Sequence, residues 1–98
     1  MSAALILEFQ GVTKAQYDAV NKKLGIDPNS GQGDWPAGLR SHVGGTSDNG
    51  GLMVVEIWDS QDAQADFMQS RLGPALGEVG VPDPTRVDWF DVIGYQTP

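Results

Sequence analysis

The chain has 98 residues, which is enough for one domain spanning residues 1–98. Its 13 acidic and 6 basic side chains give a formal net charge of −7, a balance that repels phosphate backbones and anionic lipids, so we expect no binding to nucleic acid or membranes. With no cysteine and a single histidine, the sequence excludes disulfides, cysteine nucleophiles and paired-histidine metal motifs, and we expect neither a metal nor a cofactor.

The first predicted element is a buried strand over residues 3–9 (AALILEF), which ends at Gln10-Gly11. Its apolar run lacks a basic leader, is interrupted by Glu8, and is far too short to span a bilayer. We therefore interpret it as the first strand of a cytoplasmic protein.

A helix is predicted to begin after Thr13. Thr13 has the side chain of an N-cap, and Gln16 three residues later completes a capping box. An apolar stripe at helical spacing follows, made of Tyr17, Val20 and Leu24. Gly25 is expected to end the helix.

Residues 25–38 (GIDPNSGQGDWPAG) form the longest predicted loop. Their number is close to the upper limit for a connection without secondary structure in a small domain, and such loops often cover functional sites. Two interpretations stay open: a lid that brings Trp35 to a ligand, or a surface loop whose Trp35 packs on the body of the protein.

Two strands are predicted over residues 39–47 and 51–58, joined by a tight hairpin turn at Asn49-Gly50. In a regular hairpin around this turn, the numbers of paired residues sum to 99, so that His42 lies opposite Ile57.

His42 and Arg40 would then point away from the face that carries Trp58 and toward the uncovered side of the sheet. A bulge at Gly44-Gly45 would reverse the two faces, because glycine inside a strand often marks a bulge. We favour the regular register.

A second helix is predicted after Asp59 or Ser60 and is expected to close at Gly73-Pro74. A short turn or distorted helical piece follows, and a last strand is expected from about residue 85 to residue 95. The order β-α-β-β-α-β predicts an α+β, ferredoxin-like fold with a four-stranded antiparallel sheet and two helices on one face.

The predicted strands carry apolar side chains on both faces, whereas a sheet covered on one side should alternate apolar and polar residues. If the uncovered face exposed about 500 Å² of apolar area, leaving it in water would forfeit on the order of 12 kcal/mol. We therefore predict a homodimer that pairs two sheets face to face.

The order of elements, the stretch EIWDSQDAQADF (residues 56–67) and the closing aromatic strand resemble the dimeric α+β barrel superfamily, and within it the antibiotic biosynthesis monooxygenase-like domains. This resemblance covers nearly the whole chain and implies an apolar pocket between helices and sheet. The superfamily includes cofactor-independent oxygenases and haem-degrading enzymes. The latter carry a histidine on the second helix, which is missing here, and in the oxygenases a tryptophan lines the pocket, where Trp58 is the matching residue.

Oxygenation of a phenolic molecule without a cofactor needs a dry pocket, a group that forms the phenolate and a donor near the developing charge. The candidate catalytic residues are His42 and Trp58. The candidate substrate-binding residues are Tyr17, Trp35, Arg40, Glu56 and Phe67. Each also has a purely structural interpretation, as a core side chain, a helix anchor, an ion-pair partner or, for His42, an interface residue.

Two functions therefore stay open. In the first, the pocket binds an aromatic or polyketide-like small molecule, and cofactor-independent monooxygenation or isomerisation is the candidate reaction. In the second, the chain is a non-catalytic dimerisation or regulatory module whose own side chains fill the pocket. A cavity smaller than about 300 Å³, the lower end for ligand sites, would favour the second.

Overall fold

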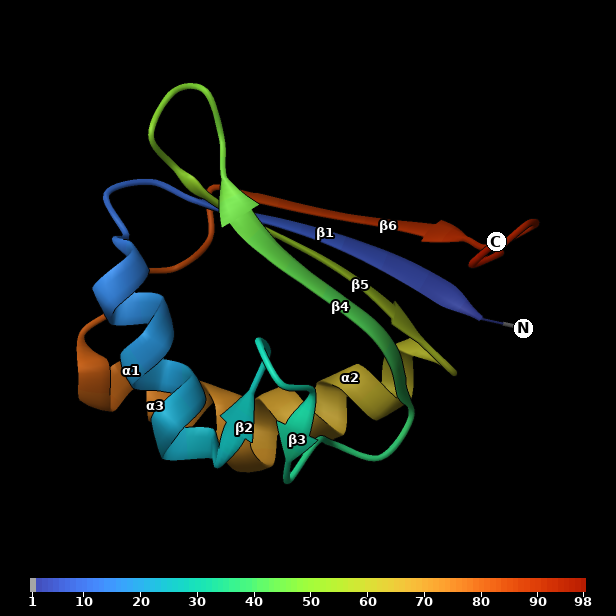
Figure 1. The fold of residues 1–98 in the computed structure, drawn as a ribbon, viewed down its shortest axis with the longest axis horizontal. Helices are drawn as coiled ribbons and strands as arrows, with labels where there is room; N and C mark the ends of the chain where they lie inside the picture. Colours follow the sequence, from blue (N-terminus) through green and yellow to red (C-terminus); the bar gives the residue numbers. More distant parts are fainter. Residues whose placement is uncertain (1) are drawn as a thin grey trace.

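The computed structural model describes residues 2–98. It contains one four-stranded antiparallel sheet with the strand order β4-β5-β1-β6. The strands are β1 (Ala3–Phe9), β4 (Leu39–Thr46), β5 (Leu52–Trp58) and β6 (Arg86–Asp91). All helical segments lie on one face of this sheet (Figure 1). The predicted α+β, ferredoxin-like fold is confirmed.

Helix α1 (Lys14–Leu24) begins and ends as predicted. Thr13 Oγ1 accepts a hydrogen bond from the backbone N–H of Gln16 at 3.2 Å, and the Gln16 side chain accepts one from the backbone N–H of Thr13 at 3.0 Å. Gly25 ends the helix in the left-handed region, with φ 73°. The buried face of α1 includes a polar side chain, Asn21, within the predicted apolar stripe.

The second helical run continues past Gly73-Pro74, so the predicted end was wrong. It consists of α2 (Gln61–Phe67), one π-helical turn η1 (Met68–Leu72) and α3 (Gly73–Val79). A proline inside an α-helix lacks the N–H donor and collides with the carbonyl group one turn earlier. The wider π turn lies directly before Gly73-Pro74, where the helix geometry changes, and the run ends only at Gly80.

The predicted loop over residues 25–38 contains a short hairpin formed by β2 (Ile26–Asp27) and β3 (Gln32–Gly33). The Asp27 carboxylate closes its turn by accepting hydrogen bonds from the Ser30 hydroxyl and the Asn29 backbone N–H, each at 2.9 Å. These two bonds, the Ser30 bond foremost, lower the pKa of Asp27. The connection is therefore built by specific polar contacts.

Arg71 fastens this hairpin to the helical layer. Its guanidinium donates to the backbone carbonyls of Leu24 at 2.8 Å and Asp34 at 2.7 Å. Trp35, which follows the hairpin, donates its indole N–H to the carbonyl of Gly31 at 3.0 Å. These bonds hold the backbone before Trp35 and the Trp35 indole in place.

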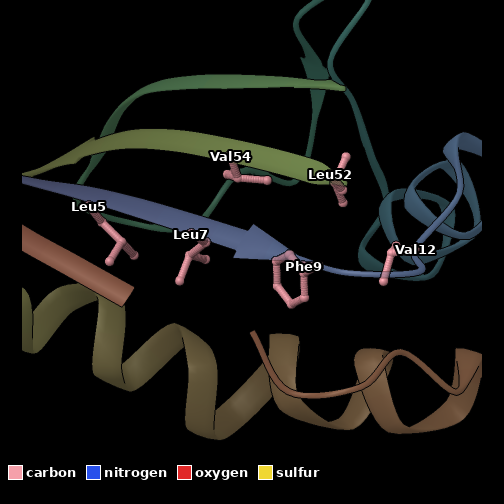
Figure 2. Packing of buried hydrophobic residues seen from close by; sticks show 6 residues of the cluster. All are labelled: Leu5, Leu7, Phe9, Val12, Leu52 and Val54. Atoms are coloured by element: carbon pink, nitrogen blue, oxygen red, sulfur yellow. The ribbon is translucent and has the colours of Figure 1, made fainter. Parts of the chain in front are cut away.

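The core lies between the sheet and the helices. Leu5, Leu7 and Phe9 of β1 point from the sheet toward the helical layer (Figure 2). A second buried cluster joins the helices to the end of β5, around a Trp58 side chain that is 0% exposed. No helix among residues 2–98 is long and apolar enough to cross a membrane.

The register of the β4–β5 hairpin differs by one residue from the prediction. Ser47 N–H donates to the carbonyl of Gly51 at 2.8 Å, and Gly50 N–H donates to the carbonyl of Ser47 at 2.9 Å, so the loop comprises residues 48–50. Gly50 has φ 84°, as expected for the left-handed residue that follows a type I turn in a three-residue loop. His42 therefore pairs with Glu56 and shares a face with Trp58.

The bulge in β4 also differs from the expected one. Gly44 and Gly45 pair regularly with Val54 and Met53, whereas the extra residue is Arg40, near the other end of the strand. The predicted placement of His42 on the uncovered face was wrong, and the reversal comes from the length of the loop.

No helix of residues 2–98 lies against the other face of the sheet (Figure 1), which carries exposed apolar side chains. Val43, Val55 and Phe90 are 61%, 39% and 54% exposed. They share this face with the partly buried Ile6 and Ile57. We call these five residues the outer apolar face.

Candidate functional site

Four polar or aromatic side chains form a hydrogen-bonded series on the helix-covered face of the sheet. The hydroxyl of Tyr17 lies 2.6 Å from His42 Nε2, and His42 Nδ1 lies 2.7 Å from Glu56 Oε2. The second carboxylate oxygen of Glu56 accepts the indole N–H of Trp58 at 3.1 Å. The arrangement joins α1, β4 and β5 through side chains alone.

Strand pairing explains why three of these residues meet. His42 and Glu56 are direct cross-strand partners, so their side chains project side by side from the sheet. Trp58 follows Glu56 by two residues and therefore points to the same face.

Tyr17 comes from α1 and reaches over β4 at Gly44. A Cβ atom at Gly44 would lie only 2.5 Å from the Tyr17 hydroxyl oxygen, far inside normal contact distance. The glycine leaves the space in which the Tyr17 hydroxyl approaches His42.

The protonation states follow from the donors and acceptors. The side chains of His42 and Glu56 are only 10% and 8% exposed, so each needs a partner for its polar atoms. An ionised carboxylate only accepts hydrogen bonds, which places the hydrogen of a neutral His42 on Nδ1. His42 Nε2 is then the acceptor for the Tyr17 O–H.

Electrostatics keep Tyr17 in its protonated form. Burial raises the pKa of Tyr17, the Asn21 side-chain amide opposes this rise, and the negative charges of Glu56 and Asp18 add to it. Tyr17 is therefore a hydrogen-bond donor at neutral pH. Because Tyr17 lines the open groove and its hydroxyl contacts neutral His42, it can accept a proton from a molecule in the groove while it donates its own proton to His42 Nε2.

Two aromatic rings enclose His42. The Tyr17 ring is stacked on it at 6.0 Å between centroids and 10° between planes, and Trp35 is tilted by 52° at 5.7 Å. On the other side of Glu56, the rings of Trp58 and Phe67 lie 5.8 Å apart. Aromatic side chains thus surround most of the hydrogen-bonded residues.

Two hollows meet at this site. A cavity of about 60 Å³ lies between sheet and helices and is almost wholly apolar. An open groove of about 450 Å³ lies outside it, along the start of α1 and β4. Tyr17, His42 and Leu52 line both hollows. The cavity alone is well below the roughly 300 Å³ of a typical ligand pocket, whereas the groove lies within that range.

The structure brings together most of the predicted site residues. Tyr17, Trp35, His42, Glu56 and Phe67 line the cavity. Trp58 touches the site through its bond to Glu56.

Arg40 lies apart from this group, because as the bulged residue it projects to solvent and pairs with Asp59. Sequence reasoning missed Asn21 and Gly44. The interruption of the apolar stripe of α1 by Asn21 was the available signal for the first. For Gly44 the signal was a glycine inside a strand, which we interpreted as a possible bulge, whereas the structure shows that it makes room for Tyr17. Residues 2–98 contain no cluster of three or more histidine or acidic side chains that could hold a metal ion.

A scan of protein-family models finds no match to this chain, and no curated protein sequence matches it. Solved structures do match. A protein from Chloroflexus aurantiacus J-10-fl, described as a "putative Antibiotic biosynthesis monooxygenase", is 17% identical with a TM-score of 0.68, and the match covers 99% of this chain and 98% of that one. The chain has the fold of the antibiotic biosynthesis monooxygenase-like proteins.

A second structure of this fold is Rv0793 from Mycobacterium tuberculosis. It is 18% identical with a TM-score of 0.69, and the match covers 99% of this chain and 100% of that one. The resemblance predicted from residues 56–67 and the order of elements is confirmed at the level of the antibiotic biosynthesis monooxygenase-like fold. At these identities the likeness concerns the fold alone.

Proposed function

We propose that this chain binds a small aromatic molecule with an acidic hydroxyl group and removes its proton through Tyr17 and His42. The observation that carries the proposal is the partly buried series of contacts Tyr17–His42–Glu56, at 2.6 and 2.7 Å. A buried histidine oriented by a carboxylate is the usual arrangement for a general base, because the carboxylate fixes the tautomer and stabilises the imidazolium that forms.

The groove of about 450 Å³ provides the space for the aromatic ring. Its ionisable oxygen would lie against Tyr17, which takes the substrate proton while giving its own to His42 Nε2. Glu56 then faces a charged imidazolium at 2.7 Å, and this pairing stabilises the proton on His42 in a site of low dielectric constant.

Oxygenation is the reaction that we assign to the deprotonated molecule. In an anthrone-type compound, the anion reacts with O₂ at the ring CH₂ group, which becomes C=O while the remaining oxygen atom leaves as water. The substrate supplies all four electrons, so no external reductant is needed. The description of the Chloroflexus protein as a monooxygenase supports this choice.

We also propose that two copies of the chain pair through the outer apolar face. Val43, Val55 and Phe90 are between 39% and 61% exposed on one side of a sheet, and such contiguous apolar patches are typical of interfaces. A second copy offers the same surface, so that an isologous pair covers both.

A second function is favoured by one observation. The cavity of about 60 Å³ between sheet and helices is far smaller than a ligand pocket, as expected for a non-catalytic dimerisation or regulatory module filled by its own side chains. In that case the bonds of His42, Glu56 and Trp58 would serve only to satisfy buried polar groups.

Two measurements separate these functions. Tryptophan fluorescence during titration with a hydroxynaphthoquinone reports binding, since Trp35 lies 5.7 Å from the His42 ring. Oxygen uptake with a hydroxylated anthrone reports turnover. We expect saturable quenching and turnover, with kcat/KM lowered about 10²–10⁴-fold in His42→Ala, the range for loss of a general base.

Ser41→Ala is the matched control, because Ser41 neighbours His42 on β4 but points to the other face. It should retain wild-type turnover. The absence of quenching at millimolar ligand, or equal turnover in wild type and His42→Ala, would contradict the proposal and support the non-catalytic module.

A further inference from the structure

Asn21 presents an unused hydrogen-bond donor to the cavity. Asn21 is only 6% exposed, and its side-chain Nδ2 is a buried atom for which residues 2–98 provide no hydrogen-bond partner. Asn21 lines the same cavity as Tyr17 and follows it by four residues, so both project from one face of α1.

The other polar groups of the cavity have partners. Tyr17 and His42 bond to each other, and both oxygen atoms of Glu56 accept hydrogen bonds. Asn21 is therefore the donor that remains available to an occupant.

An unpaired amide inside an apolar cavity destabilises the fold, because it has lost its water and gained no partner. A leucine at this position would continue the stripe of Val20 and Leu24 without that penalty. A molecule that brings an acceptor oxygen into the cavity would give Asn21 Nδ2 the hydrogen-bond partner that it lacks.

We propose that Asn21 is a binding residue that selects ligands with a carbonyl or phenolate oxygen, by donating its Nδ2–H to that oxygen beside Tyr17. This inference rests on the proposed function, since the same ligand meets Tyr17 and His42. It narrows the substrate class to oxygen-bearing aromatic molecules and gives the developing anion a fixed donor.

The test uses 1-indanone and indane, two ligands of the same ring skeleton in which a C=O group replaces a CH₂ group, and follows their binding to the full chain by ¹H–¹⁵N NMR. We expect wild type to bind 1-indanone about tenfold more tightly than indane, a ratio in the range for one hydrogen bond in a buried site. The side-chain NH₂ resonance of Asn21 should shift with 1-indanone and stay in place with indane.

In Asn21→Leu the preference should fall to about one, while indane binds at least as well as to wild type. Asn21→Ala is a second variant with the same expected loss of preference, should the leucine disturb packing. Leu24→Met, a volume-conserving change in the same cavity, is the control and should keep the preference.

Equal preference in wild type and both Asn21 variants, with an unmoved Asn21 resonance, would show that the amide meets only water and would overturn this inference alone. If wild type binds neither ligand nor the hydroxynaphthoquinone, the inference and the proposed function fail together. Binding of the hydroxynaphthoquinone without preference for 1-indanone leaves the proposed function standing and removes the role of Asn21.

Discussion

The two faces of the sheet differ in what surrounds alternate residues of the same strands. On the helix-covered face, Glu56 and Trp58 of β5 are buried and bonded within one polar chain. On the other face, Val55 of the same strand is 39% exposed and has no covering element among residues 2–98. A single strand thus supplies the candidate chemistry with one set of side chains and the candidate interface with the other.

The surroundings of each side chain in β4 depend on the register of the strand. His42 and Val43 are neighbours in sequence, yet one is enclosed by Tyr17 and Trp35 while the other is 61% exposed. Because side chains alternate along a strand, a shift of one residue would exchange these two environments.

The largest effect is expected on the outer apolar face. Val55→Asp would place a charge in the centre of the proposed interface, where burial without a partner is strongly unfavourable. We expect wild type to sediment as a dimer at low micromolar concentration and the variant as a monomer, with a dissociation constant raised on the order of 100-fold or more.

Ile93→Asp is the control for this prediction. Ile93 is 100% exposed beyond the end of β6, so a charge there changes the net charge equally without entering the sheet face. It should remain dimeric. A wild-type chain that sediments as a stable monomer would end the proposal of sheet pairing.

A smaller effect is expected at a glycine pair that straddles the two faces. Gly44→Ala would press a methyl group against the Tyr17 hydroxyl and separate it from His42, at a cost of about 1–3 kcal/mol in the free energy of unfolding. Gly45→Ala meets no atom within 4 Å and should stay within about 0.5 kcal/mol of wild type.

Chemical denaturation measures both stabilities, and the ¹⁵N resonances of the His42 ring report whether the Tyr17 contact is kept. Equal stabilities together with unchanged His42 resonances in both variants would mean that Tyr17 does not occupy the position over Gly44.

The smallest effect concerns alkaline pH. Because the pKa of Tyr17 is raised above 10.0 in the folded state, the unfolded chain loses this proton first as pH rises, and the free energy of unfolding decreases above pH 10 until the folded pKa is passed. Tyr17→Phe lacks the titrating group and should show a shallower decrease. Urea denaturation between about pH 9 and pH 11, about one unit on either side of the ordinary tyrosine pKa, measures the free energy of unfolding of both proteins. An equal decrease with pH in wild type and Tyr17→Phe would contradict this assignment.

Much of the fold was predictable from local signals. The capping box of Thr13 and Gln16 and the left-handed Gly25 set both ends of α1 through short-range bonds that the sequence displays directly. The end of the second helical run at Gly80 was missed. The π turn at Met68–Leu72 lets the run continue through Pro74, and no residue type in the sequence distinguishes such a turn from the end of a helix.

Most of the residues that meet around His42 were named from the sequence as candidates, but their arrangement was not predicted. Asn49-Gly50 correctly predicted a hairpin, but the bonds of Ser47 make the loop one residue longer than the expected two-residue turn. That one residue moved His42 from the proposed interface to a position opposite Glu56. Loop length depends on competing bonds of similar strength, so residue types alone do not decide it.

Arg71 joins segments that are distant in the sequence. Its guanidinium bonds the end of α1 and the backbone next to Trp35 to the second helical run. Loss of this one side chain would therefore loosen the aromatic wall beside His42 without removing any group assigned to proton transfer.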